Sequence, residues 1–256
     1  MNDAVHDEDL ETVSGGPAAA QGDPHMAEGA GGEVVLLLAD ISGYTRFMLA
    51  NRTEMAHGQG IITDLLQAVI RQLEIPMEVH KFEGDAVFIT AEFGGAQTWE
   101  ETGRLIGRKL HAFIEAFDAA LLNLARSNAC HCGACDNMAK LTLKVIAHKG
   151  IALRYRIGRF EELSGADVIL VHRLLKNSVP GTKYLLVTEA AFGFLRLGDD
   201  FERAVERYDD VGEIPVRYKL LAPLHGLSEH RLHRMNLGDS LRKMRYGART
   251  LFTRKR

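Results

Sequence analysis

The stretch VVLLLADISGYTRF, residues 34–47, decides the fold. Its apolar run 34–39 predicts a buried strand that ends at Asp40, and Gly43 then marks a turn into a helix. Such a turn directs backbone N–H groups and the positive end of a helix dipole toward an anion. The stretch therefore predicts a strand, a turn and a helix, with an acidic side chain at the end of the strand.

A second acidic residue lies in VHKFEGDAVFI, residues 79–89, which predicts a β-hairpin with Gly84 and Asp85 at its tip. Two neighbouring strands that each present an aspartate near the same edge can chelate Mg²⁺ or Mn²⁺, with a substrate phosphate completing the shell. Alternatively, Asp40 and Asp85 are each an ordinary N-cap or turn residue, because aspartate is common at helix N-caps and in turns.

Helices and strands follow one another along the rest of the chain. Apolar residues at helical spacing predict two long helices, over about 52–73 and 101–126. Shorter helices are predicted at 165–177 and 188–197, and strands at 33–40, 77–91 (a hairpin), 140–147, 150–158, 183–187 and 203–222 (a pair). Residues 148–150, His-Lys-Gly, read as the turn between two of these strands. This order indicates an α+β, ferredoxin-like (split βαβ) fold with a mainly antiparallel sheet and helices packed on it.

The 256 residues suffice for one substantial domain, and the shares of hydrophobic (46%) and charged (25%) residues are ordinary for a globular protein. We assign this domain to residues 33–225. Residues 1–32 carry acids and no Lys or Arg and are expected to be a disordered tail, whereas 226–256 form a basic tail. Both tails are interpreted as solubilising, with a docking arm for an acidic partner or an anionic membrane as the alternative.

No apolar run reaches the length of a membrane-spanning helix, and the first residues lack the pattern of a secretory signal. We therefore expect a cytoplasmic location and no membrane span.

The aspartate that ends an apolar strand, and the Gly-Asp hairpin about 45 residues further on, resemble the class III adenylate and guanylate cyclases. The resemblance covers residues 34–223 in outline. It is stronger to an uncharacterised bacterial branch with a Cys-rich insert and a segment like HRLLKN, residues 172–177. It implies that Asp40, Ile41 and Asp85 hold two Mg²⁺ or Mn²⁺ ions. It also implies a homodimer with two equivalent sites, in which ATP or another purine nucleoside triphosphate is bound between the subunits.

The resemblance assigns a purine-reading pair to Lys81, four residues before the Gly-Asp aspartate, and to Glu162, three residues before Gly165. In the family, a Lys at the first position goes with adenine. The chemistry fits, because a cation can donate to adenine N1 and a carboxylate can accept from the exocyclic amine.

The segment GADVILVHRL, residues 165–174, matches a family helix whose arginine, here Arg173, stabilises charge on the transferring phosphate. Two positions depart from the family pattern. Ile169 stands where the family has an asparagine that orients the ribose. No basic residue occupies 209–212, where the family has a phosphate-binding lysine, so Lys176, Arg217 or Lys219 would have to substitute.

All three cysteines lie in NACHCGACD, residues 128–136, which is a poor disulfide framework. The spacing favours a Zn²⁺ site at Cys130, Cys132 and Cys135, with His131, Asp136 or a distant histidine as fourth ligand. Redox-responsive thiols and inert cysteines remain alternatives. Such a metal is expected to lie away from the two aspartates. Two histidines on the apolar faces of the long helices are interpreted as core residues, His57 and His111.

Together these features predict a nucleotidyl cyclase-like protein that binds ATP with Mg²⁺ or Mn²⁺ and, if active, forms cyclic AMP and pyrophosphate. The main alternative is a catalytically inactive cyclase-homology domain that acts as a dimeric nucleotide-binding or signalling module. A third is a zinc-stabilised interaction module that binds no nucleotide. We expect no nucleic-acid partner.

Overall fold

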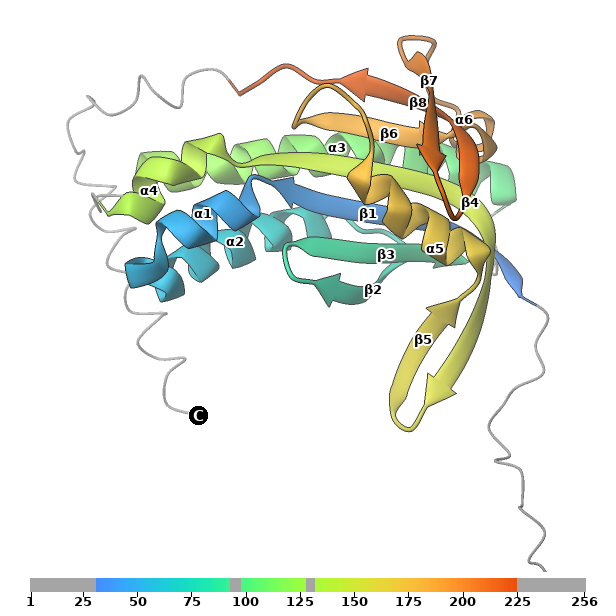
Figure 1. The fold of residues 1–256 in the computed structure, drawn as a ribbon, viewed down its shortest axis with the longest axis horizontal. Helices are drawn as coiled ribbons and strands as arrows, with labels where there is room; N and C mark the ends of the chain where they lie inside the picture. Colours follow the sequence, from blue (N-terminus) through green and yellow to red (C-terminus); the bar gives the residue numbers. More distant parts are fainter. Residues whose placement is uncertain (1–30, 93–97, 128–131, 225–256) are drawn as a thin grey trace, which may run out of the picture.

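The computed structural model describes residues 31–92, 98–127 and 132–224 (Figure 1). Its strands are β1 (Gly32–Ser42), β2 (Met77–Glu83), β3 (Ala86–Glu92), β4 (Thr142–Ile157), β5 (Phe160–Ser164), β6 (Tyr184–Thr188), β7 (Glu202–Tyr208) and β8 (Gly212–Leu220). Its α-helices are α1 (Tyr44–Ala50), α2 (Met55–Ile70), α3 (Trp99–Ser127), α4 (Gly133–Asn137), α5 (Ala166–Arg173) and α6 (Glu189–Leu195). Short 3₁₀ helices are η1 (Arg52–Glu54), η2 (Met138–Lys140) and η3 (Leu174–Lys176).

The strands form one sheet in the order β2-β3-β1-β4-β6-β8-β7, and β5 pairs with β4 beside this path. Every pairing is antiparallel except that of β4 with β6, which are parallel and are connected through β5 and α5. The structure therefore confirms the α+β fold with a mainly antiparallel sheet.

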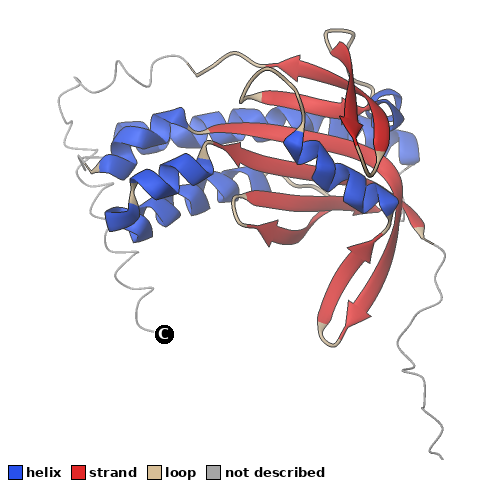
Figure 2. Cartoon of the chain, viewed as in Figure 1, coloured by secondary structure: helices blue, strands red, loops and turns tan. Residues whose placement is uncertain are grey.

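Helices cover both faces of this sheet (Figure 2). The larger core lies between the sheet and helices α2, α3 and α6, and the smaller one lies under α5. Strand β1 contributes alternate residues to the two cores, Leu37 to the larger and Leu36 to the smaller. Because both faces of β1 are buried over residues 34–39, this part of its sequence is a continuous apolar run without polar alternation.

Helix α3 approaches the end of α6 at two glycines. A Cβ at Gly103 would lie 2.2 Å from the carbonyl oxygen of Phe194, and one at Gly107 would lie 2.2 Å from that of Leu195. These distances are far below van der Waals contact, so this close packing of helix against helix requires glycine at both positions.

The predicted long helices, the 77–91 hairpin and the last strand pair are all present. The turn predicted at 148–150 is wrong, because β4 continues through it as a single strand of 16 residues. Gly150 instead makes room for a carboxylate: a Cβ there would lie 2.3 Å from Asp167 Cγ, while Ile151 N donates to Asp167 Oδ2 at 2.7 Å. Strand β5, which returns along the end of β4, was not predicted.

Residues 1–30 and 225–256 lie outside the described part of the chain, so the tails and the domain limits stay predictions. Within the described ranges, no helix is both long enough and apolar enough to cross a membrane.

Candidate functional site

Asp40 and Asp85 lie in contact where β1 ends beside the turn between β2 and β3. Asp40 is paired in register with Ala86, the first residue of β3, and Asp85 lies in the turn just before it. The backbone joins the two positions as well, because Ile41 N donates to the carbonyl oxygen of Asp85 at 3.3 Å. Burial and the neighbouring charge of Asp40 raise the pKa of the Asp85 carboxyl to about 6, and a hydrogen bond between the two side chains adds to the shift.

A lysine that the sequence analysis missed completes this group. Lys144 on β4 is in register with Asp40 on β1, and its Nζ lies 2.8 Å from Asp40 Oδ2. The same Nζ donates to the carbonyl oxygen of Leu175 at 3.2 Å. Lys144 thus places a positive charge directly against one of the two carboxylates.

The acidic pair opens into a pocket of about 560 Å³. The turn after β1 forms one wall of this pocket, and Gly43 permits that turn because its φ is 92°. Asn137 and Lys140, which follow the Cys-rich segment, form another part of the wall. The residues that follow the Cys-rich segment therefore line the same pocket as the two aspartates.

These residues fit a hard divalent cation. Two carboxylates in contact repel each other when both are ionised, and Mg²⁺ and Mn²⁺ prefer oxygen ligands. Ile41 has a hydrocarbon side chain, so this residue can contribute only its backbone carbonyl. Lys144 is the positive charge with which such a cation would compete.

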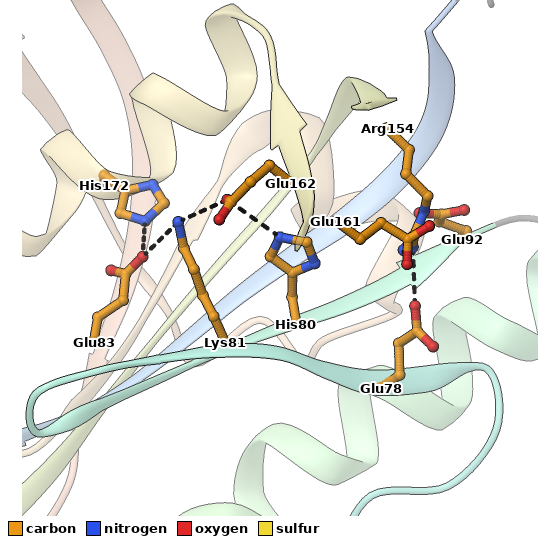
Figure 3. Close-up of polar contacts among 9 residues, drawn as sticks. All are labelled: Glu78, His80, Lys81, Glu83, Glu92, Arg154, Glu161, Glu162 and His172. Carbon is orange, nitrogen blue, oxygen red and sulfur yellow. Dashed lines mark hydrogen bonds and ion pairs between the residues drawn. The ribbon is translucent and has the colours of Figure 1, made fainter. Parts of the chain in front are cut away.

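Lys81 on β2 and Glu162 on β5 lie side by side (Figure 3), with 3.4 Å between Nζ and Oε2. Lys81 Nζ also lies 3.3 Å from Glu83 Oε1. Burial alone would lower the pKa of Lys81, but Glu83 and Glu162 together raise it. The structure thus brings together the two side chains that the resemblance pairs.

Glu83, whose role the sequence did not indicate, connects this pair to α5. It faces His172, with 2.9 Å between Glu83 Oε1 and Nε2 (Figure 3). The other ring nitrogen of His172 lies 2.7 Å from the carbonyl oxygen of Val168.

A second, more open pocket of about 370 Å³ lies along α5 and η3. It is lined by Val168, Ile169, His172, Arg173 and Lys176, and Ile169 is 56% exposed. This lining has no residue in common with that of the pocket at the aspartates. Asp40 and Asp85 therefore line one pocket, and Arg173 lines the other.

Arg173 forms an ion pair with Asp210, which lies in the turn between β7 and β8. Of the three cations predicted as phosphate-binding substitutes, Lys176 lines the same pocket as Arg173. The other two have acidic partners elsewhere, because Arg217 donates to Glu189 at 2.8 Å and Lys219 pairs with Asp200.

Comparison with known proteins gives two matches at the level of sequence and several at the level of fold. A family model described as a protein of unknown function (DUF2652) matches residues 62–184. The uncharacterised protein Rv2561/Rv2562 of Mycobacterium tuberculosis is 34% identical over 128 residues, which cover 50% of this chain and 57% of that protein. The match thus spans little more than half the length of this curated relative.

Among solved structures, the adenylyl cyclase CyaB of Pseudomonas aeruginosa superposes with a TM-score of 0.56 at 11% identity, over 75% of this chain and 96% of that one. The guanylyl cyclase Cya2 gives 0.51 at 14% identity, over 77% and 98%. The chain has the class III cyclase fold. A class III adenylyl cyclase-like ATP-binding protein from Pseudomonas aeruginosa also matches, with a TM-score of 0.51 at 18% identity over 64% of this chain and 35% of that one.

Within this class III cyclase fold, the described part of the Cys-rich segment, residues 132–136, lies beside the start of α2. Cys130 and His131 are outside the described residues, whereas Cys132 and Cys135 contact His57. His57, interpreted from the sequence as a core residue, is partly buried, and its ring faces two sulfur atoms. His111 on α3 is also partly buried, and burial lowers its pKa.

Proposed function

We propose that this domain is a nucleotidyl cyclase-like protein that binds ATP together with Mg²⁺ or Mn²⁺. The observation that carries the proposal is the contact between the carboxyl groups of Asp40 and Asp85 beside a pocket of about 560 Å³. Bound divalent cations would activate the ribose 3′-hydroxyl and neutralise the phosphates as pyrophosphate leaves. The product of turnover would be cyclic AMP.

The choice of ATP rests on Lys81 and Glu162. Their side chains lie 3.4 Å apart, so an ammonium donor and a carboxylate acceptor are presented together. Adenine offers a matching acceptor at N1 and a donor at its amino group, whereas guanine has a protonated N1. A ligand that enters between the two groups would replace their mutual ion pair.

We further propose that the complete site forms between two copies of this chain. The acidic pair lines one pocket, and Arg173 lines another that shares no residue with it. A two-fold dimer would bring the acidic pocket of one copy to the Arg173 pocket of the other, twice by symmetry. Each copy would then supply half of each site.

Turnover by purified protein tests this proposal. With MnATP we expect cyclic AMP, and we expect Asp85→Ala to abolish its formation while leaving the fold intact. Asp199→Ala, at an exposed acid between α6 and β7, is the matched control and should keep wild-type turnover. Absence of ATP binding at millimolar concentration in the presence of Mn²⁺ would overturn the proposal.

A second candidate function is ATP binding without turnover. It is favoured by the ion pair between Arg173 and Asp210, which neutralises the proposed transition-state cation, and by exposed Ile169 in place of a ribose-binding asparagine. This candidate predicts ATP binding that depends on Asp85 and no cyclic AMP at any metal concentration. Calorimetry and a product assay on the same sample separate the two candidates.

A further inference from the structure

A cluster of two cysteines and one histidine joins α4 to α2. Cys132 Sγ lies 3.3 Å from His57 Nδ1, Cys135 Sγ lies 3.7 Å from His57 Nε2, and the two sulfur atoms are 3.6 Å apart. One ligand atom from each of the three residues can be chosen so that all lie within 4.8 Å of one another. No other group of this kind occurs among residues 31–92, 98–127 and 132–224.

The separations of the two sulfurs from each other and of Cys132 Sγ from one ring nitrogen are close to those of ligands around one tetrahedral cation. Zn–S bonds of ~2.3 Å and Zn–N bonds of ~2.0 Å at the tetrahedral angle put two sulfurs ~3.8 Å apart and a sulfur and a nitrogen ~3.5 Å apart. The two sulfurs are 3.6 Å apart, and Cys132 Sγ lies 3.3 Å from His57 Nδ1. The 3.7 Å contact of Cys135 Sγ is to the other ring nitrogen, and an imidazole offers only one nitrogen to a given cation, so the bound on the complete ligand set is 4.8 Å. A disulfide would need the sulfurs at ~2.05 Å.

The backbone places the two thiols on one side of a single turn. Cys132 immediately precedes α4, and Asp136 N donates to the carbonyl oxygen of Cys132 at 3.1 Å, so Cys135 returns to the same side. Packing holds this turn in place, because Ala134 and Met138 are buried in the larger core. A Cβ at Gly133 would lie only 2.8 Å from Asn51 Oδ1. The thiols are therefore positioned by packing around them.

We propose that His57, Cys132 and Cys135 bind one Zn²⁺ ion, which fastens α4 to α2. Thiolate and imidazole ligands favour Zn²⁺ over Mg²⁺ and Mn²⁺, whereas the carboxylates of Asp40 and Asp85 favour the latter two. The two sites thus select different cations. Three protein ligands leave one tetrahedral position, which a water molecule can take. The residues that carry this assignment are separate from those that carry the proposed nucleotide binding.

Metal analysis of the full-length chain tests the assignment. We expect about one zinc per chain after purification without chelator, and a loss of zinc affinity by about two orders of magnitude or more in His57→Gln and in Cys135→Ser. His111→Gln, which removes a partly buried histidine on another helix, is the matched control and should keep its zinc. Asp85→Asn should also keep it, since the carboxylate site is separate.

Replacement of the zinc by Co²⁺ gives a readout that does not depend on the variants. The wild-type protein should then show thiolate-to-cobalt charge-transfer absorption and the intense d–d bands of a tetrahedral site. Wild-type protein that takes up no zinc on reconstitution would overturn the proposal. So would a His57→Gln variant with unchanged zinc affinity, or a disulfide between Cys132 and Cys135 in protein purified without oxygen.

Discussion

Lys144 Nζ lies 2.8 Å from Asp40 Oδ2, on the side chain that is proposed to bind a divalent cation. The lysine comes from β4 and the aspartate from β1, and the register of the two strands places them opposite each other. The ammonium group already neutralises part of the charge that a metal ion would neutralise. The acidic pair is therefore expected to bind a divalent cation more weakly than two carboxylates without a neighbouring lysine would.

Lys144→Met should strengthen Mn²⁺ binding. Removing the ammonium leaves both carboxylates available, and we expect the dissociation constant for Mn²⁺ to fall by about 5–10-fold, equivalent to about 1–1.4 kcal/mol. Mn²⁺ titration followed by electron paramagnetic resonance measures this. Lys140→Met is the control, because Lys140 lines the same pocket and donates to Asn137. Unchanged or weaker Mn²⁺ binding in Lys144→Met would contradict the prediction.

Metal binding and stability should both depend on pH through Asp85. Its pKa is raised from 3.8 to about 6, so the folded protein holds this proton more tightly than the unfolded chain. The stability that this group supports is fully present below pH 3.8 and is lost as the pH rises to about 6. In the folded protein, protons should displace the metal as the pH falls below about 6.

Asp85→Asn should therefore stabilise the metal-free protein at pH 8 and lose that advantage toward pH 4. Each kcal/mol gained corresponds to about 2–4 °C in the melting temperature for a chain of this size. Thermal unfolding across this range, without divalent cations, measures the effect. Asp199→Asn should show no such pH-dependent advantage, and a flat profile for Asp85→Asn would refute the argument.

Asp210→Asn should increase turnover if the protein is a cyclase. Asp210 pairs with Arg173, and releasing the guanidinium would let it meet developing charge on the phosphate. We expect kcat for cyclic AMP formation to rise several-fold, and Arg173→Ala to lower it by about 100-fold or more. Asp209→Asn, in the same turn but outside that ion pair, should leave kcat unchanged. Equal effects of the two asparagine variants would rule out the Arg173 pair as the cause.

Lys81→Ala should remove the preference for adenine. Without the ammonium donor, ATP should lose about tenfold in affinity, and GTP should change little, so the ratio of their affinities approaches one. Competition binding with both nucleotides gives this ratio. Arg154→Ala is the matched control, because Arg154 is a cation in the neighbouring group of glutamates (Figure 3). If ATP and GTP weakened equally in Lys81→Ala, the lysine would not read the base.

The sequence was sufficient for features that depend on local pattern. The apolar run before Asp40 predicted the central strand because both faces of β1 are buried, and Gly84-Asp85 marked the hairpin. The sequence was insufficient where the contacts of a residue depend on partners that are distant in the chain. Lys144 faces Asp40 only through the register of β1 with β4, and nothing local to Lys144 encodes that register.

Two further residues show the same limit. Gly150 reads locally as a turn residue, yet its missing side chain accommodates the carboxylate of Asp167 within a continuous strand. His57 lies on a helix with an apolar face, and only the packing of α4 reveals the sulfur atoms beside it. In both cases the meaning of the residue is set by an element that follows much later.

Removal of the proposed zinc should weaken nucleotide binding at the other site. The 3₁₀ helix η2 follows α4 directly, and Asn137 and Lys140 line the pocket of Asp40. Without zinc, α4 would be held less firmly against α2, and that wall of the pocket would be less ordered. We therefore expect the affinity for MnATP to fall by about 3–10-fold after zinc removal and to return when zinc is restored. Calorimetry on zinc-free and zinc-loaded protein measures this, with His111→Gln treated in parallel. Unchanged MnATP affinity in protein shown to lack zinc would mean that the wall is held by packing alone.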